Sequence, residues 1–245
     1  MPFSSFFRNT KKPPSTEKRT ILTDVSWQKF ESLLSELGAE RQTRLTYFRG
    51  KLELMTPIAA HERCNKLIES LILILAEELH LSVSNLIPIL LKAPEIGCAV
   101  EPDACYYFAT LNNLSGSPMD SIEAMQGKTE LNLPPNPPPD LLVEVAFTKS
   151  NLDKLSIYAR LGIPEVWRYI TKPDEDILKG KLLIYELQDY HPGHRQDRYY
   201  VERQTSLVFP FLEASRVLQF LEESDSMSLA TAVRLLRAWV KAKNI

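Results

Sequence analysis

The sequence predicts an α/β protein in which a mixed sheet is flanked by helices. Helical and strand patterns alternate along the chain, with a predicted β-hairpin before and after the central part. Residues 61–80 carry apolar side chains at helical spacing and form the strongest amphipathic helix of the chain. Residues 140–147, DLLVEVAF, are almost continuously apolar, which is typical of a strand buried on both faces.

The composition is that of a soluble globular protein. The chain has 245 residues, of which 44% are hydrophobic, enough for one large domain or one domain with extensions. The net charge of −2 does not indicate a nucleic-acid binder by itself, although a local basic surface is compatible with it. Three cysteines without a CxxC pair indicate reduced thiols in a cytoplasmic protein. No stretch approaches the roughly 20 apolar residues of a membrane-spanning helix, so we expect no membrane partner.

The N-terminal half contains a tail, a helix and several strands. Residues 1–20 are rich in Pro, Ser, Thr and Lys and predict a flexible tail. A helix is expected up to Gly38, with Thr23 or Ser26 as its cap, and a hairpin is expected around Arg49 and Gly50. After the helix over 61–80 we expect two strands. They cover 81–94, where Pro88 indicates a bulge or an edge, and 96–108, which carries Glu101 and Asp103.

Residues 111–139 contain Gly, Asn, Ser and many prolines and predict a long loop inserted between strands. Such a loop in a compact domain is usually functional or mobile, and we expect it to be mobile or to contact a partner subunit. A helix should follow the strand at 140–147, with Ser150 as a cap and Asp153 three residues on, and it should end at Gly162. The remaining strands are expected at 164–170, 181–188 and 198–209.

The expected domain organisation follows from these elements. A tail (1–20) precedes one domain (21–221), which contains the loop insertion 111–139. Residues 222–245 predict a basic amphipathic helix at the end of the chain.

Glu144 lies in the middle of the apolar strand, where a charge is costly unless something binds it. Asp103, after Pro102, lies on a strand expected to be its neighbour. Two carboxylates on adjacent strands can share one hard divalent cation such as Mg²⁺ or Mn²⁺. Lys154, at the start of the next helix, could position a water molecule or stabilise the charge of a phosphate. This arrangement predicts a metal site.

Other interpretations of the same residues stay open. Asp103 could simply end a strand, and Glu144 could pair with an arginine. Lys154 could be a solvated helix residue, as most lysines are. His61 lies at the edge of the apolar stripe of its helix and could be a packed core histidine or a site residue.

The pieces YFRGKLELMTPIAAHERCNKLIESL, EPDACYYF, PPDLLVEVAFTKS, DKLSIYARLGIPEVWRYI and SLVFP resemble the Uma2-type proteins, also called DUF820. The resemblance runs from about residue 45 to about residue 210. These proteins are classed with the restriction-endonuclease-like PD-(D/E)XK nucleases. The resemblance implies that fold, with a mixed central sheet and N-terminal and C-terminal β-hairpin extensions.

The resemblance also implies site residues. Pro102-Asp103 matches the PD motif, and Glu144 matches the acidic residue of the (D/E)XK motif, so both would be metal ligands. The lysine position of that motif is Ala146, and Lys154 matches nucleases in which this lysine has moved to the following helix. Lys149, between the strand and the helix, is the alternative lysine. His61 occupies the place where the family has a polar residue, often histidine, at the start of the first core helix, and it completes the catalytic candidates.

The function implied is that of a Mg²⁺-dependent or Mn²⁺-dependent endonuclease acting on nucleic acid, with DNA favoured over RNA. Many nucleases of this fold pair to cut two strands, which leaves a homodimer open. The alternatives are a nucleic-acid-binding or protein-interaction module without turnover, and a structural protein with a buried ion pair.

Overall fold

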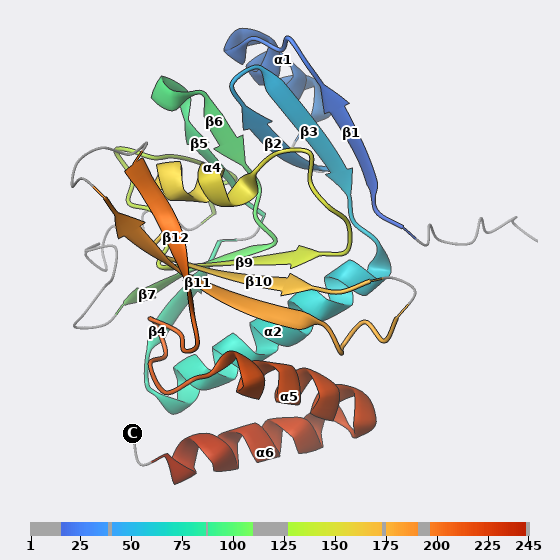
Figure 1. Ribbon diagram of the computed structural model, residues 1–245, viewed down its shortest axis with the longest axis vertical. Coiled ribbons are helices and arrows are strands. Elements are labelled where there is room, and N and C mark those ends of the chain that lie inside the picture. The colour runs from blue at the N-terminus through green and yellow to red at the C-terminus, as the bar shows by residue number, and fades with distance from the viewer. Residues whose placement is uncertain are drawn as a thin grey trace, which may run out of the picture.

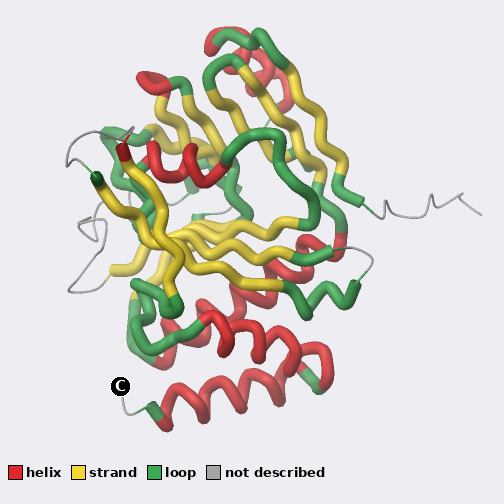
Figure 2. Tube along the Cα trace, in the orientation of Figure 1, coloured by secondary structure: helices red, strands yellow, loops and turns green. Residues whose placement is uncertain are grey.

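The computed structural model describes residues 16–38, 41–86, 88–109, 127–172, 175–190 and 197–243. Within these ranges the chain forms two six-stranded sheets and the helices that cover them (Figures 1 and 2). The strand order is β1-β3-β2-β6-β5-β8 in the first sheet and β12-β11-β10-β9-β7-β4 in the second. The prediction of a mixed α/β fold is confirmed, but the strands are divided between two sheets rather than gathered in one.

The first sheet contains the predicted hairpin. Its neighbouring strands are antiparallel except for the parallel pair β5–β8. The two turn residues, Arg49 and Gly50, have φ angles of 46° and 85°, as a tight hairpin turn requires. The strands are β1 (Lys18–Leu22), β2 (Arg44–Phe48), β3 (Lys51–Thr56), β5 (Leu90–Ala93), β6 (Cys98–Val100) and β8 (Glu130–Asn132).

Helix α1 (Trp27–Leu37) packs on one face of this sheet. Ser26 caps it by accepting a hydrogen bond from the backbone N–H of Lys29, at 3.2 Å. Phe30 and Leu34 of the helix are buried with Leu45 and Tyr47 of β2. One of the two predicted caps is therefore confirmed. The short 3₁₀ helix η1 (Pro94–Ile96) joins β5 to β6.

The second sheet has helices on both faces. Helices α2 (Ala59–Glu78) and α5 (Ala214–Ser226) cover one face, and α6 (Leu229–Ala242) packs against both of them. Helix α4 (Lys154–Leu161) lies on the other face, between the two sheets (Figure 1). The strands are β4 (Ser82–Asn85), β7 (Ala104–Ala109), β9 (Leu141–Ala146), β10 (Glu165–Ile170), β11 (Lys181–Asp189) and β12 (Arg198–Arg203).

The alternation of side chains along β9 assigns its residues to two cores. Val143 and Val145 belong to the core beneath α2 and α5. Leu142 belongs to the core on the α4 side. Because successive side chains of a strand point to opposite faces, Glu144 faces the α4 side, toward the first sheet.

The prediction of one strand over residues 81–94 and one strand over residues 96–108 is wrong. Each segment is divided, with β4 and β7 in the second sheet and β5 and β6 in the first. The chain passes between the sheets near Pro88 and again over Glu101–Asp103. Proline has no backbone N–H to donate to a neighbouring strand. Pro88 and Pro102 accordingly lie between strands, where no inter-strand hydrogen bond requires this donor.

Several other predictions need correction. Residues 18–20 were predicted as part of a flexible tail, but they belong to β1. The predicted loop 111–139 contains β8, whose Leu131 is buried, while residues 110–126 lie outside the described ranges, so the expectation about their mobility stays a prediction. Asp153, not Ser150, caps α4.

The C-terminal region contains one helix more than predicted. The predicted final helix corresponds to α6, whereas α5, which precedes it and ends at Ser226, was missed. Its buried side chains, such as Val217 and Phe220, pack into the core beneath the second sheet. In the described part of the chain, no helix has the length and apolar character needed to cross a bilayer.

Glu165 connects β10 to the segment that leads into α5. Its buried carboxylate accepts hydrogen bonds from Trp167 Nε1 at 2.6 Å, from the N–H of Leu207 at 3.0 Å and from the N–H of Val208 at 2.8 Å. We predict that Glu165→Gln lowers the free energy of unfolding by about 1–3 kcal/mol, because the amide NH₂ group would face one of these donors. Chemical unfolding of both proteins measures the loss. Glu202→Gln, an exposed change on β12, is the control, and equal unfolding midpoints for Glu165→Gln and wild type would contradict the prediction.

Candidate active site

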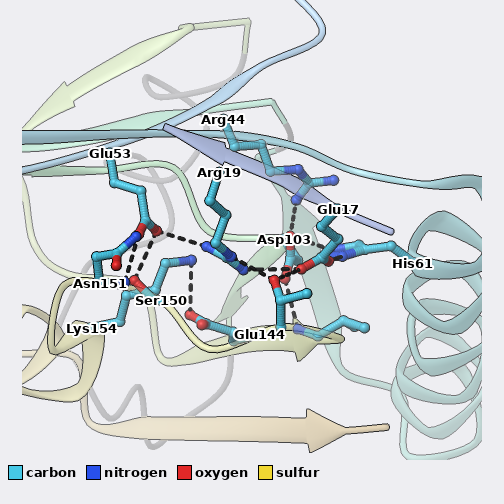
Figure 3. Close-up of polar contacts among 12 residues, drawn as sticks. Glu17, Arg19, Arg44, Glu53, His61, Asp103, Glu144, Ser150, Asn151 and Lys154 are labelled. Carbon is cyan, nitrogen blue, oxygen red and sulfur yellow. Dashed lines mark hydrogen bonds and ion pairs between the residues drawn. The ribbon is translucent and has the colours of Figure 1, made fainter. Parts of the chain in front are cut away.

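The two carboxylates identified from the sequence lie together between the sheets. Ala104 of β7 pairs with Val143 of β9, so Asp103, directly before β7, stands opposite Glu144. Both side chains are buried, with exposed fractions of 1% and 3%. Figure 3 shows them in one polar cluster, with side chains of the first sheet above them and helix α2 beside them. The prediction that they are neighbours on one face is confirmed.

Asp103 is held by three different elements. Its Oδ1 accepts hydrogen bonds from Arg44 of β2 and from His61 Nε2 of α2, the latter at 2.8 Å. Its Oδ2 accepts from the N–H of Val145 on β9, at 2.7 Å. Burial by itself would raise the pKa of Asp103, but the charges of His61 and Arg44 outweigh it and hold this pKa well below its usual range. Asp103 is therefore an anion throughout the physiological range.

His61 stands between two acids in the first turn of α2. Its Nε2 contacts Asp103, and its Nδ1 lies 2.5 Å from Glu17 Oε1. Burial alone would lower the pKa of His61, yet the charge and hydrogen bond of Asp103 and the hydrogen bond to Glu17 raise it to about 9. The imidazole is fully enclosed and both nitrogens are engaged. The structure thus brings His61 into the site, in contact with Asp103.

Glu144 is contacted by α4. The ammonium of Lys154 lies 3.3 Å from Glu144 Oε2, and the hydroxyl of Tyr158 donates to the same oxygen. Burial, and then the charge of Glu144, raise the pKa of Tyr158 well above its ordinary value, so this hydroxyl keeps its proton. Lys149 is exposed. Of the two candidate lysines, Lys154 is the one whose ammonium is at the carboxylates.

Glu53 fixes the connection that carries Lys154. Its carboxylate accepts from Ser150 Oγ at 2.8 Å, from the N–H of Asn151 at 2.7 Å and from Arg19 at 2.7 Å. Burial would raise the pKa of Glu53, but these donors outweigh it and lower this pKa. A side chain of the first sheet therefore orients the segment between β9 and α4.

Arg19 and Thr148 connect this group to the acid beside His61. Arg19 Nε donates to Thr148 Oγ1 at 2.7 Å, and the Thr148 hydroxyl donates to Glu17 Oε2 at 2.5 Å. Arg19 also forms ion pairs with Glu17 and Glu53. A continuous set of hydrogen bonds thus extends from Glu53 to Asp103 (Figure 3).

Sequence analysis assigns no site role to several residues of this cluster. Tyr158 could have been found, because it lies four residues after Lys154 and hence on the same side of a helix. Glu53 had a weak signal, as a charge between the leucines of a short strand. Arg44 had none, and neither did Glu17 and Arg19, whose neighbourhood has the composition of a tail.

The oxygen donors at this place suit a hard cation. Glu144 Oε1 accepts no hydrogen bond from the described residues, and Asp103 Oδ2 accepts one. No group of three or more His, Cys, Asp or Glu side chains in the described ranges is placed to hold a metal. Mg²⁺ is commonly bound by one or two carboxylates, with waters and substrate phosphates as further ligands. By type of ligand, Asp103 and Glu144 therefore fit such an ion.

Comparison with known proteins gives one family match. The model of the Uma2 family, described as "Putative restriction endonuclease", matches residues 27–220. The match includes Asp103, Glu144, Lys154 and His61, but it begins after Glu17 and Arg19. No curated protein matches the chain.

Glu17 tests whether the N-terminal strand is part of the site. We predict that Glu17→Gln lowers the free energy of unfolding by about 3 kcal/mol, because it removes one of the two anions that each of the buried groups Arg19 and His61 contacts. Thermal and chemical unfolding measure this loss. Lys18→Ala, at the exposed position next to Glu17, is the matched control, and a loss no larger than that of Lys18→Ala would show that Glu17 is dispensable.

Proposed function

Because the chain belongs to the Uma2 family, we propose that it is a metal-dependent nuclease that hydrolyses phosphodiester bonds of nucleic acid. At the family level, the description supports a nuclease. The observation that carries the proposal for this chain is the position of Asp103 and Glu144 on adjacent strands, with the Lys154 ammonium 3.3 Å from Glu144. In the proposal these carboxylates hold Mg²⁺ or Mn²⁺.

The side chains have separate roles in this proposal. When bound, the ion supplies Lewis acidity toward a phosphoryl oxygen. Lys154 stabilises negative charge on the phosphate, as a preorganised cation in a site that excludes most water. Tyr158 orients the carboxylate of Glu144 by donating a hydrogen bond to it. His61 is enclosed and contacts Asp103, so we assign it to positioning that carboxylate rather than to contact with substrate.

The substrate and setting are part of the proposal. DNA is proposed ahead of RNA, since the matched family is described as a restriction endonuclease. A homodimer would allow two sites to cut two strands. The three cysteines are buried in the cores, which fits reduced thiols in a reducing compartment, and we propose the cytoplasm.

One observation favours a second candidate, a binding module that keeps the fold without turnover. Each charged group around the two carboxylates already has a partner of opposite charge, as in a structural ion-pair network. Such a network stabilises a fold only with good geometry, and it needs no ion. A cleavage assay separates the two candidates.

We predict that the purified full chain nicks or cuts DNA in the presence of Mn²⁺ or Mg²⁺, and that a chelator stops the reaction. Asp103→Asn and Glu144→Gln should abolish cleavage, because each removes an anionic ligand oxygen. Lys154→Ala should slow cleavage by about 100-fold, the range found when one preorganised donor is removed. Gel electrophoresis of supercoiled plasmid and of single-stranded DNA and RNA measures the rates.

Lys149→Ala is the control for Lys154→Ala, because it removes an exposed lysine from the adjacent connection. It should cleave at the rate of wild type. No cleavage by wild type on any of these substrates, or equal cleavage by wild type and Asp103→Asn, would refute the proposed nuclease and favour the binding module.

A further inference from the structure

The carboxylate of Asp103 is largely occupied by protein donors. An ionised carboxylate offers about four acceptor positions. Arg44 and His61 use two of them at Oδ1, and the N–H of Val145 uses one at Oδ2. An ion at Asp103 would therefore bind a carboxylate that the guanidinium of Arg44 already contacts.

The charges of the two acids are also compensated. Arg44 forms an ion pair with Asp103, and Lys154 forms an ion pair with Glu144. Two cations thus match two anions, and the charge of His61, which also contacts Asp103, is matched by Glu17 at its other nitrogen. A divalent cation is attracted by excess negative charge, and this place has none while Arg44 stays on Asp103.

Arg44 is the cation with room to move. Its side chain is 17% exposed, whereas that of His61 is fully buried between two acids. Arg44 has a second anion, Glu62, at 2.7 Å from the other end of its guanidinium. Arg44 and Glu62 line a cavity of about 660 Å³, which Pro102 also lines. Since an arginine does not lose its proton in proteins, only movement can remove its charge from Asp103.

We propose that Arg44 is a built-in counter-cation of Asp103 that controls metal affinity. A divalent cation binds well only when the guanidinium leaves Asp103, keeps its pair with Glu62 and turns into the adjacent cavity. Arg44 thereby keeps the metal-free site neutral and sets the threshold at which the ion binds. This inference rests on the proposed metal site of Asp103 and Glu144.

The direct test measures Mn²⁺ binding by titration calorimetry of the full chain. Arg44→Gln should bind Mn²⁺ about tenfold or more tightly than wild type. Partners that orient metal ligands change the affinity by this order when they are removed, and here the sign is reversed because the partner is a cation that competes with the ion. Arg41→Gln is the matched control. Arg41 lines the same cavity but pairs with Glu101, so its loss should leave the affinity unchanged. Adding Asp103→Asn to Arg44→Gln should remove the gain.

A second variant gives an expectation of opposite sign and does not disturb the buried pair. Glu62 is 41% exposed, so Glu62→Gln should fold as wild type does, which circular dichroism checks. Without this anchor, Arg44 has only Asp103 as an anion, and Mn²⁺ binding should weaken by several-fold. Unchanged affinity in both Arg44→Gln and Glu62→Gln would overturn the role of Arg44, as would weaker binding in Arg44→Gln.

Cleavage assays separate this inference from the proposed function. Tighter Mn²⁺ binding by Arg44→Gln without cleavage by any variant would refute the nuclease and leave the role of Arg44 standing. Cleavage by wild type with no change of affinity in Arg44→Gln would refute the role of Arg44 and leave the nuclease standing. Absence of Mn²⁺ binding in wild type and in all variants would overturn both the role of Arg44 and the proposed metal-dependent nuclease.

Discussion

The burial of the Asp103 carboxylate is the constraint on which the arrangement of this molecule depends. A charge taken out of water must be paired and hydrogen-bonded, or the folded state bears the full cost of its desolvation. Asp103 obtains its partners from β2, α2 and β9, which belong to both sheets and to the helix between them in sequence. The same contacts that stabilise this anion therefore hold the first sheet in its position relative to the second sheet.

The N-terminal strand shows how far this requirement extends. Glu17 and Arg19 lie outside the range matched by the family, yet they contact His61, Thr148 and Glu53 within the cluster. Through Glu53, the first sheet also holds the backbone of the segment that leads to Lys154. In a buried charged cluster, the surrounding side chains determine the geometry and charge of the central carboxylates as much as the carboxylates themselves do.

Elements with strong local patterns were predictable. The amphipathic stripe of α2, the apolar run of β9 and the turn at Arg49–Gly50 all depend on neighbours in sequence, and all three formed where expected. The segments 81–94 and 96–108 were misjudged, because each looks like one apolar strand while its two halves pair in different sheets. Strand pairing is a long-range choice, and a continuous apolar run does not show where the chain changes partner.

The sequence by itself determined the family of folds and singled out three charged residues: Asp103 after a proline, Glu144 in a buried strand, and Lys154 at the next helix start. Glu144 and Lys154 lie on consecutive elements, so their proximity follows from local order. Asp103 meets Glu144 because β7 pairs with β9, although β8 comes between them in the sequence. Only the tertiary structure decided which cations compensate them. Arg44 is 59 residues from Asp103, and Glu17 is 44 residues from His61, so no local periodicity connects either pair. Their contacts form because buried charges must find partners wherever the fold brings them near.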